Sequence, residues 1–285
     1  MKIAISGSNG YIAKNLIPEL ESSNHDVIRI ERYELSDVDQ LTKKLFDIDV
    51  VISLAGAPIL KRWTNANKNE ILRSRIDSTQ NIVHAINRLT TEHRPGLFIS
   101  ASAIGIYSPN KVHTEESDSF STDFVSEVVK SWEKASDELN PEVRKVIFRI
   151  GLILGKEAKT IQSLVPIIKL GLGGKIGTGK QPFPFIHIGD AIRAILWSIE
   201  NNHAKGIYNL VAPENIDNKT FTKTLAESLN RPAIFTVPEF VLKIALGEAS
   251  ALLLQNPQVY PERLLNEGFK FKFPDIHSTI KEIIH

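Results

Sequence analysis

Short apolar runs alternate with amphipathic stretches along the first half of the chain. Runs rich in β-branched residues cover residues 2–6, 26–30, 50–54, 97–101 and 145–149, and the stretches between them have helical periodicity. Strands with several consecutive apolar residues are typical of parallel sheets that helices cover on both faces. The pattern therefore predicts an α/β fold, a doubly wound parallel sheet of the Rossmann type.

The composition and the predicted elements change after Gly155. A glycine-rich segment covers residues 171–179, and the chain from Arg231 onward predicts mostly helix with connecting loops. We therefore expect residues 1–155 to form a Rossmann core. Residues 156–285 are expected to add the remaining core elements and a small, mostly helical C-terminal cap on the substrate side, within one intertwined domain.

The composition is that of an ordinary globular chain. Its 285 residues are 42% hydrophobic and 24% charged, which is enough for one large core with room for a small subdomain. The 34 basic and 33 acidic side chains leave a formal charge of +1, so no overall field favours nucleic acid or an acidic membrane surface as partner. We expect a small molecule as the partner, and the oligomeric state stays open.

Missing residue types and patterns narrow the chemistry further. The chain has no cysteines, which excludes disulfides, thiolate catalysis and Cys-ligated zinc. No spacing of His, Asp and Glu indicates a metal site, and no apolar segment is long enough for a signal peptide or a membrane span. The sequence thus predicts a cytoplasmic protein without a metal or a membrane partner.

A glycine-rich turn follows the first predicted strand and opens the first predicted helix. Gly7 permits the tight turn and Gly10 lets the backbone approach a pyrophosphate, while the helix N-terminus supplies N–H donors and a positive dipole end. The order of strand, turn and helix predicts a dinucleotide site. The residues assigned to the cofactor from this motif are Gly7, Asn9, Gly10, Tyr11 and Ile12.

The second predicted strand ends at Glu31-Arg32, where NAD and NADP are usually told apart. An acid at this position accepts the ribose hydroxyls of NAD, whereas an arginine pairs with the 2′-phosphate of NADP. Either Arg32 holds the phosphate and Glu31 turns to solvent, or Glu31 binds the ribose and Arg32 is a surface charge. We favour Arg32, and hence NADP(H) over NAD(H).

The third strand-like run ends at Leu54-Ala55-Gly56, where small residues let the backbone pass beside the adenosine half of the cofactor. Further short motifs follow over the rest of the chain. They are Arg62-Trp63, Ser74-Arg75, Ser100-Ala101-Ser102-Ala103, Trp132-Glu133, Gly173-Gly174, Ile186-His187-Ile188-Gly189-Asp190, Val237-Pro238, Gly247-Glu248 and Gln258-Val259 with Pro261. Together they resemble the atypical epimerase family, a branch of the extended short-chain dehydrogenases/reductases that is often described as nucleoside-diphosphate-sugar epimerase-like.

This resemblance implies a Rossmann core that binds NADP(H), with a cap over the nicotinamide. It places Arg32, Leu54, Ala55, Glu70 and Arg75 near the cofactor. The residues themselves add little for the last two, because a spacing of five does not put them squarely on one helix face. A solvated helix with a surface arginine would have the same spacing.

The resemblance also implies a catalytic serine and a Tyr-x-x-x-Lys pair, in which the tyrosine moves the proton and the lysine lowers its pKa. Ser102 fits the serine that polarises the substrate oxygen. Aligning Glu133 with the glutamate that often follows the lysine places Val125 and Val129 at the two ionisable positions, and neither can titrate. The usual pair is therefore missing.

Three other residues are candidates for the substrate side. Tyr107 follows the Ser102 strand and either donates a proton or packs against the cap. His187 lies in an apolar run and either lines the substrate pocket or is a hydrogen-bonded structural histidine. Gln181 follows the glycine-rich segment and is assigned to the substrate. The segment itself is either a flexible lid, a phosphate-binding loop or a set of tight turns.

Two functions of different class follow. The first is an NADP(H)-dependent oxidoreductase or epimerase that acts on a nucleotide sugar or a related carbonyl or alcohol compound, with Ser102 as the catalytic residue. The alternative is a catalytically silent protein that binds NADP(H) as a sensor or interaction partner. The missing pair favours the alternative, whereas the apparent cofactor site fits both.

Overall fold

The computed structural model describes residues 1–109 and 111–285. Its centre is a six-stranded sheet in the order β10-β6-β4-β3-β1-β2, and all neighbouring strands are parallel. This confirms the predicted Rossmann-type sheet. The strands are β1 (Lys2–Ser6), β2 (Asp26–Ile30), β3 (Val50–Ser53), β4 (Leu97–Ala103), β6 (Arg144–Ile150) and β10 (Gly206–Leu210).

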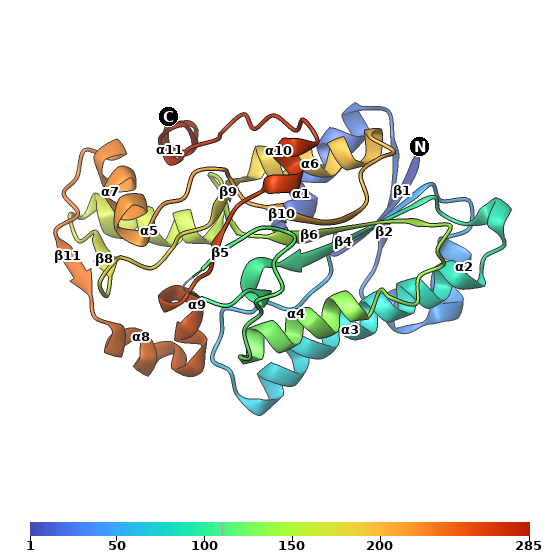
Figure 1. Ribbon diagram of the computed structural model, residues 1–285, viewed down its shortest axis with the longest axis horizontal. Helices are drawn as coiled ribbons and strands as arrows, with labels where there is room; N and C mark the ends of the chain where they lie inside the picture. The colour runs from blue at the N-terminus through green and yellow to red at the C-terminus, as the bar shows by residue number, and fades with distance from the viewer. Residues whose placement is uncertain (110) are drawn as a thin grey trace.

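Helices cover both faces of the sheet, as Figure 1 shows for α6 and α10 above it and for α3 and α4 below it. Successive strand residues alternate between the two layers: Ile3 and Ile5 belong to the core under one set of helices, and Ala4 belongs to the core under the other. The covering helices are α1 (Tyr11–Ser22), α2 (Val38–Lys44), α3 (Asn65–Arg88), α4 (Phe124–Lys134), α6 (Ile188–Glu200) and α10 (Glu262–Asn266).

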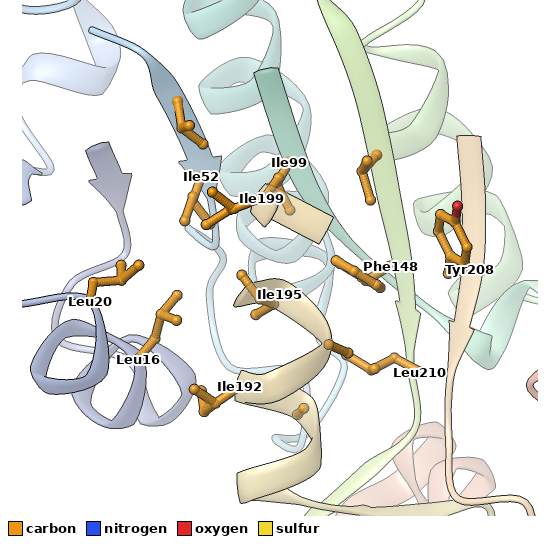
Figure 2. Packing of buried hydrophobic residues seen from close by; sticks show 14 of the residues in the cluster. Leu16, Leu20, Ile52, Ile99, Phe148, Ile192, Ile195, Ile199, Tyr208 and Leu210 are labelled. Atoms are coloured by element: carbon orange, nitrogen blue, oxygen red, sulfur yellow. The ribbon is translucent and has the colours of Figure 1, made fainter. Parts of the chain in front are cut away.

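The larger core lies between the sheet and the pair α1 and α6. Figure 2 shows side chains of both helices meeting the strand residues Ile52, Ile99 and Phe148. Leu16 and Leu20 of α1 are fully buried there, at 0% exposure. Burying a leucine contributes about 1.5–3 kcal/mol, so this layer fixes where α1 begins and hence where the glycine turn lies.

The remaining elements form the cap and its connections, at the left end of Figure 1. Its helices α5, α7 and α11 share one apolar cluster with β7 and β9. The elements are β7 (Leu152–Leu154), α5 (Lys159–Lys169), β8 (Gly174–Ile176), β9 (Phe185–His187), α7 (Asn218–Ser228), β11 (Phe235–Val237), α8 (Glu239–Leu246), α9 (Ala251–Leu254) and α11 (Ile276–Ile284). Short pieces complete the chain: β5 (Val112–His113), β12 (Gln258–Val259), η1 (Glu34–Ser36), η2 (Thr91–His93), η3 (Ile104–Ile106) and η4 (Gly247–Ser250).

The C-terminal segment is hydrogen-bonded to the first turn of α6. Asp190 is fully buried there and accepts hydrogen bonds from the backbone N–H groups of Lys272 and Phe273, both at 2.8 Å. Arg193 donates to the same carboxylate at 2.9 Å. These three donors satisfy the buried carboxylate, and the two backbone hydrogen bonds tie the end of the chain to the Rossmann core.

Among the helices in the described ranges, none is long and apolar enough to span a membrane.

Candidate functional site

A cavity of about 860 Å³ opens at the carboxyl ends of β1, β2 and β3. The strand order reverses at β1, because β2 lies on one side of it and β3 on the other. Such a switch point leaves a crevice outside the strand ends, where ligands of doubly wound sheets bind. The cavity is thus at the place that the fold class predicts.

The glycine turn forms one wall of the cavity with Gly7, Ser8, Asn9 and Gly10. Gly7 has a φ of +73°, and a Cβ on it would lie 2.8 Å from the carbonyl carbon of Leu54. Only glycine fits this position. Gly10 has ordinary extended angles and caps α1, so the free N–H groups of the first helical turn lie beside the cavity.

Glu31 and Arg32 line the cavity at the end of β2, as expected from the sequence. The backbone N–H of Glu31 donates to Glu34 at 2.6 Å, and Lys44 donates to both oxygens of that carboxylate. This contact fixes the chain just after β2. Arg32 forms no ion pair with any described residue. Its charge contributes to the lowered pKa of Glu70, which lines the same cavity.

Residues that follow β3 form the floor. Leu54, Ala55 and Gly56 all line the cavity. The N–H of Ala57 donates to the Ser74 hydroxyl at 2.9 Å, which anchors this loop to α3.

Helix α3 contributes a wall that sequence reasoning missed. Arg73, Ser74, Asp77, Ser78 and Asn81 all line the cavity. They form two neighbouring rows at a spacing of four, Arg73, Asp77 and Asn81 in one and Ser74 and Ser78 in the other, and therefore share one side of the helix. The sequence alone did not single them out, because α3 also has polar residues on its solvent-exposed side.

Glu70 also lines the cavity, near its mouth. It accepts a hydrogen bond from the Lys61 ammonium at 2.5 Å, and this bond lowers the pKa of Glu70. Glu70 is thus part of a salt bridge at the cavity mouth.

Arg75, Tyr11 and Ile12 lie outside the cavity lining, although all three are assigned to the cofactor from the sequence. The Arg75 guanidinium lies behind Gly56 and over the ring of Trp132, and burial lowers the pKa of Arg75 to about 10. It has no acidic partner among the described residues. Tyr11 and Ile12 pack against the main core. Their cofactor roles stay predictions.

Ser102 lies in a buried polar network beyond the cavity. Its hydroxyl donates to Glu133 at 2.6 Å, and Arg149 binds both oxygens of Glu133 at 2.8 and 2.7 Å. Burial opposes the charge of Arg149, but its hydrogen bonds to Glu133 outweigh that effect, so the pKa of the guanidinium is raised. Because the carboxylate can only accept, the Ser102 proton is committed to Glu133.

Tyr107 extends this network toward the outer strand β10. Its hydroxyl accepts a hydrogen bond from Arg149 at 2.8 Å and donates one to Asn209 at 2.9 Å. Burial raises the pKa of Tyr107, and the side chain is 2% exposed. In this arrangement the phenol stabilises the network, and its role toward a substrate stays a prediction.

Val125 and Val129 occupy one side of α4, against η3. Val129 is buried in an apolar cluster with Ile104 and Tyr107, and Val125 packs directly over Gly105. Two aliphatic side chains therefore fill the place assigned to the tyrosine and lysine, and neither can transfer a proton.

Gln181 and His187 both make internal hydrogen bonds. The Gln181 amide donates to the backbone carbonyls of Ile176 and Leu253, at 3.2 and 3.3 Å. His187 caps α6 by accepting from Gly189, and its Nε2 lies 2.7 Å from Glu282. Both side chains hold cap elements together, and their substrate roles stay predictions.

The His187 cap predicts a pH dependence of stability. Burial lowers the pKa of His187 and outweighs the opposing effect of Glu282, so the folded state favours the neutral ring. Its contribution is complete above about pH 6.5 and is lost as the pH falls toward the lowered pKa, because only the unfolded chain then binds a proton. We expect the urea midpoint to fall more steeply from about pH 7 to about pH 5 in the parent than in His187→Asn, whose amide keeps the cap. If the urea midpoints of the two proteins fell equally with pH, the prediction would be wrong.

Comparison with known proteins decides the family. Residues 3–210 match the model of the NAD dependent epimerase/dehydratase family. The chain belongs to this family. Residues 237–283 match a second model, described as a domain of unknown function, DUF1731. The family site binds a nicotinamide dinucleotide, in agreement with the glycine turn and the crevice at the strand ends.

Relatives of this family extend over the whole chain. The epimerase family protein SDR39U1 of Mus musculus is 33% identical over 296 residues, which cover 100% of each chain. The Bacillus subtilis epimerase family protein YfhF is 34% identical and covers 100% of this chain and 98% of its own. An Arabidopsis thaliana relative, 31% identical over 100% of this chain and 87% of its own, is named as chloroplastic. The cytoplasmic location expected here stays a prediction.

Solved structures agree with this membership. Human epimerase family protein SDR39U1 with NADPH superposes with a TM-score of 0.93 at 31% identity, over 100% of this chain and 99% of that one. A nucleoside-diphosphate sugar epimerase from Corynebacterium glutamicum has a TM-score of 0.78 at 25% identity, and the match covers 100% of this chain and 58% of that one. The predicted family resemblance is confirmed.

Proposed function

We propose that this epimerase-family protein binds NADP(H) in preference to NAD(H). The observation that carries the proposal is Arg32, which lines the cavity at the end of β2 without an acidic partner among the described residues. Arg73 lines the same cavity from α3, but its guanidinium lies 3.4 Å from Asp77, so Arg32 is the arginine assigned to the phosphate. A 2′-phosphate would receive charge-assisted hydrogen bonds there. The human relative with NADPH supports the same choice.

The site fits the dinucleotide on its own geometry. The Gly7 cradle has no room for a Cβ, and the N–H groups of the first turn of α1 lie where a pyrophosphate would approach. When bound, the nicotinamide supplies or accepts a hydride. The chain's residues then bind and orient it through the glycine turn, the residues after β3 and the polar face of α3.

We further propose that this protein does not transfer a proton through the usual tyrosine. Val125 and Val129 fill the two ionisable positions, and the Ser102 proton is committed to Glu133. Ser102 thus offers only oxygen lone pairs to a neighbour, which suits a hydroxyl or amide donor and not a carbonyl oxygen. This favours a protein that binds NADP(H) without ordinary turnover.

The second candidate is an oxidoreductase or epimerase that acts on a nucleotide sugar or a related compound. The observation in its favour is the whole-chain likeness to a structure titled as a nucleoside-diphosphate sugar epimerase. Incubation with NADPH or NADP⁺ and a panel of nucleotide sugars, followed at the nicotinamide absorbance and by sugar analysis, separates the two. Sustained turnover that is lost in Ser102→Ala would show that the protein is an enzyme. It would contradict the proposal that the protein binds NADP(H) without ordinary turnover.

The cofactor preference predicts the effect of Arg32→Ala. We expect the parent to bind NADPH more tightly than NADH, and the variant to lose roughly ten- to a hundredfold in NADPH affinity, because a charge-assisted contact is worth about 1.5–3 kcal/mol. NADH affinity should change little. Fluorescence titration measures both. The matched control is Arg29→Ala, since Arg29 is exposed on the same strand and does not line the cavity. Equal parent affinities would assign specificity to Glu31.

A further inference from the structure

Exposed apolar side chains gather at one end of the cap. Most of the large apolar residues that stay exposed in the described part of the chain fall in two short segments, one at the end of α5 and one through β11 and α8. Scattered exposed leucines are normal on a protein surface, but a contiguous group marks an interaction site. The group consists of Ile167, Leu170, Leu172, Ile234, Phe235, Phe240, Val241 and Ile244.

The two segments are joined, and we call residues 167–172 and 231–244 the cap tip. The Arg231 guanidinium donates to the Lys169 carbonyl at 2.9 Å, and the Phe235 N–H donates to Gly173 at 3.3 Å. Helix α8 follows β11 directly and has no buried residue. Figure 1 shows α8 and β11 at the edge of the molecule, away from the central sheet.

A small basic pocket lies beside the cap tip. Its volume is about 140 Å³, and Lys175, Lys219 and Lys223 line it together with Ile234 and Phe235. The pocket is much smaller than the several hundred Å³ that a nucleotide needs, but it has room for one phosphate-sized group. Lys175 and Lys219 have no acidic partner among the described residues, whereas Lys223 lies 3.6 Å from Glu227. The lining therefore keeps a net positive charge, which favours an anion.

The charges around the tip are mainly positive. Glu227 and Glu239 are each paired with a lysine four residues away, at 3.6 Å. Further basic side chains without an acidic partner in the described ranges are Lys169, Lys180 and Arg231. The formal charge of +1 is an average over the whole chain, and it does not show this local cluster.

The shape and charge together identify the occupant. In a symmetric dimer the same patch would face itself, which would bring lysines against lysines. The apolar side chains also protrude: Leu170 and Ile234 are each 76% exposed, and Ile244 is 70% exposed. Protruding apolar groups with a basic surround suit a bilayer, where the apolar groups enter the interface and the lysines meet lipid phosphates.

We propose that the cap tip docks on an anionic membrane surface. Ile234, Phe240 and Ile244 enter the headgroup region, and a lipid phosphate occupies the pocket of Lys175, Lys219 and Lys223. The docking is peripheral, and it places the protein at the bilayer without a spanning helix. It needs no bound cofactor and does not rest on the proposed function.

Vesicle sedimentation tests the proposal. The full chain is mixed with phosphatidylcholine vesicles that contain or lack phosphatidylserine. We expect binding to the anionic vesicles only, and weaker binding as salt rises. Lys219→Gln with Lys223→Gln should reduce the affinity roughly thirtyfold, since each lysine near the surface contributes about a factor of five. Ile234→Ser with Ile244→Ser should also reduce it.

The controls separate docking from loss of the fold and from general charge. Lys14→Gln with Lys134→Gln removes two exposed lysines outside the cap and should bind vesicles as the parent does. NADPH binding should be unchanged in every variant, because none of these residues lines the cofactor cavity. Equal sedimentation with and without phosphatidylserine would overturn the proposal. Binding of inorganic phosphate without any binding to vesicles would also overturn it. The same holds if the protein does not bind vesicles but self-associates, and Ile234→Ser with Ile244→Ser abolishes the self-association.

Discussion

Gly10→Val should abolish dinucleotide binding while the protein still folds. Gly10 already has extended backbone angles, φ −74° and ψ 159°, which a β-branched residue adopts readily. A Cβ there would lie 3.1 Å from the Gly7 carbonyl oxygen, a tight contact that a small shift relieves. The branched side chain would instead occupy the space in which a pyrophosphate approaches the backbone. We expect a loss of more than roughly a hundredfold in affinity, because steric exclusion removes the whole contact.

Calorimetry with NADPH measures this loss, and circular dichroism reports on the fold. Gly7→Ala is the contrasting variant, because its Cβ would clash with the backbone of Leu54 at a positive φ, and it should lower stability as well as binding. Gly96→Ala is the neutral control, since nothing lies within 4 Å of its added Cβ. Normal binding by a folded Gly10→Val protein would mean that this turn does not hold the phosphates.

Breaking the buried pair of Arg149 and Glu133 should cause a large loss of stability. Removing either partner leaves an uncompensated charge in a site where the Arg149 side chain is 4% exposed and the Glu133 side chain 13%. Arg149→Met or Glu133→Met should each lower the free energy of unfolding by roughly 3–5 kcal/mol. The double variant should lose far less than the sum, because no buried charge remains.

Chemical denaturation of the four proteins forms a double-mutant cycle that isolates the coupling. The exposed pair of Arg73 and Asp77, at 3.4 Å, is the control, and Arg73→Met should change the free energy of unfolding by less than about 0.5 kcal/mol. Additive losses at Arg149 and Glu133 would show that the two side chains act independently, and the network described for Ser102 would then be wrong.

The sequence predicted the strands and the turn that are determined by residues close together in the chain. Strands β1, β3, β4 and β6 are largely buried and therefore read as apolar runs, whereas the edge strand β2 is partly exposed. The positions of all five were correct within a few residues. The Gly7 turn was also predictable, because a strand, a glycine turn and a helix follow one another without interruption. In the structure this turn lines one cavity together with Arg32 and the residues after β3.

Features that depend on distant contacts were missed. Strand β10 (Gly206–Leu210) contains Asn209, a polar residue that breaks the apolar run and is buried only because Tyr107 and Tyr260 satisfy its amide. The partnership of Ser102 with Glu133 and Arg149 joins residues up to 47 positions apart, through three elements. No single segment carries such a signal, so it appears only when the sheet is assembled.

The hydrogen bonds to Asp190 have a consequence for how the chain can be divided. The family matches separate residues 3–210 from 237–283. The two backbone donors to Asp190 nevertheless come from the second region, whereas the carboxylate lies in the first. Ile276, Ile280 and Ile283 of α11 likewise complete a cluster begun by α5 and α7. The C-terminal region therefore has no hydrophobic interior of its own. We therefore expect the C-terminal region not to fold as a separate module.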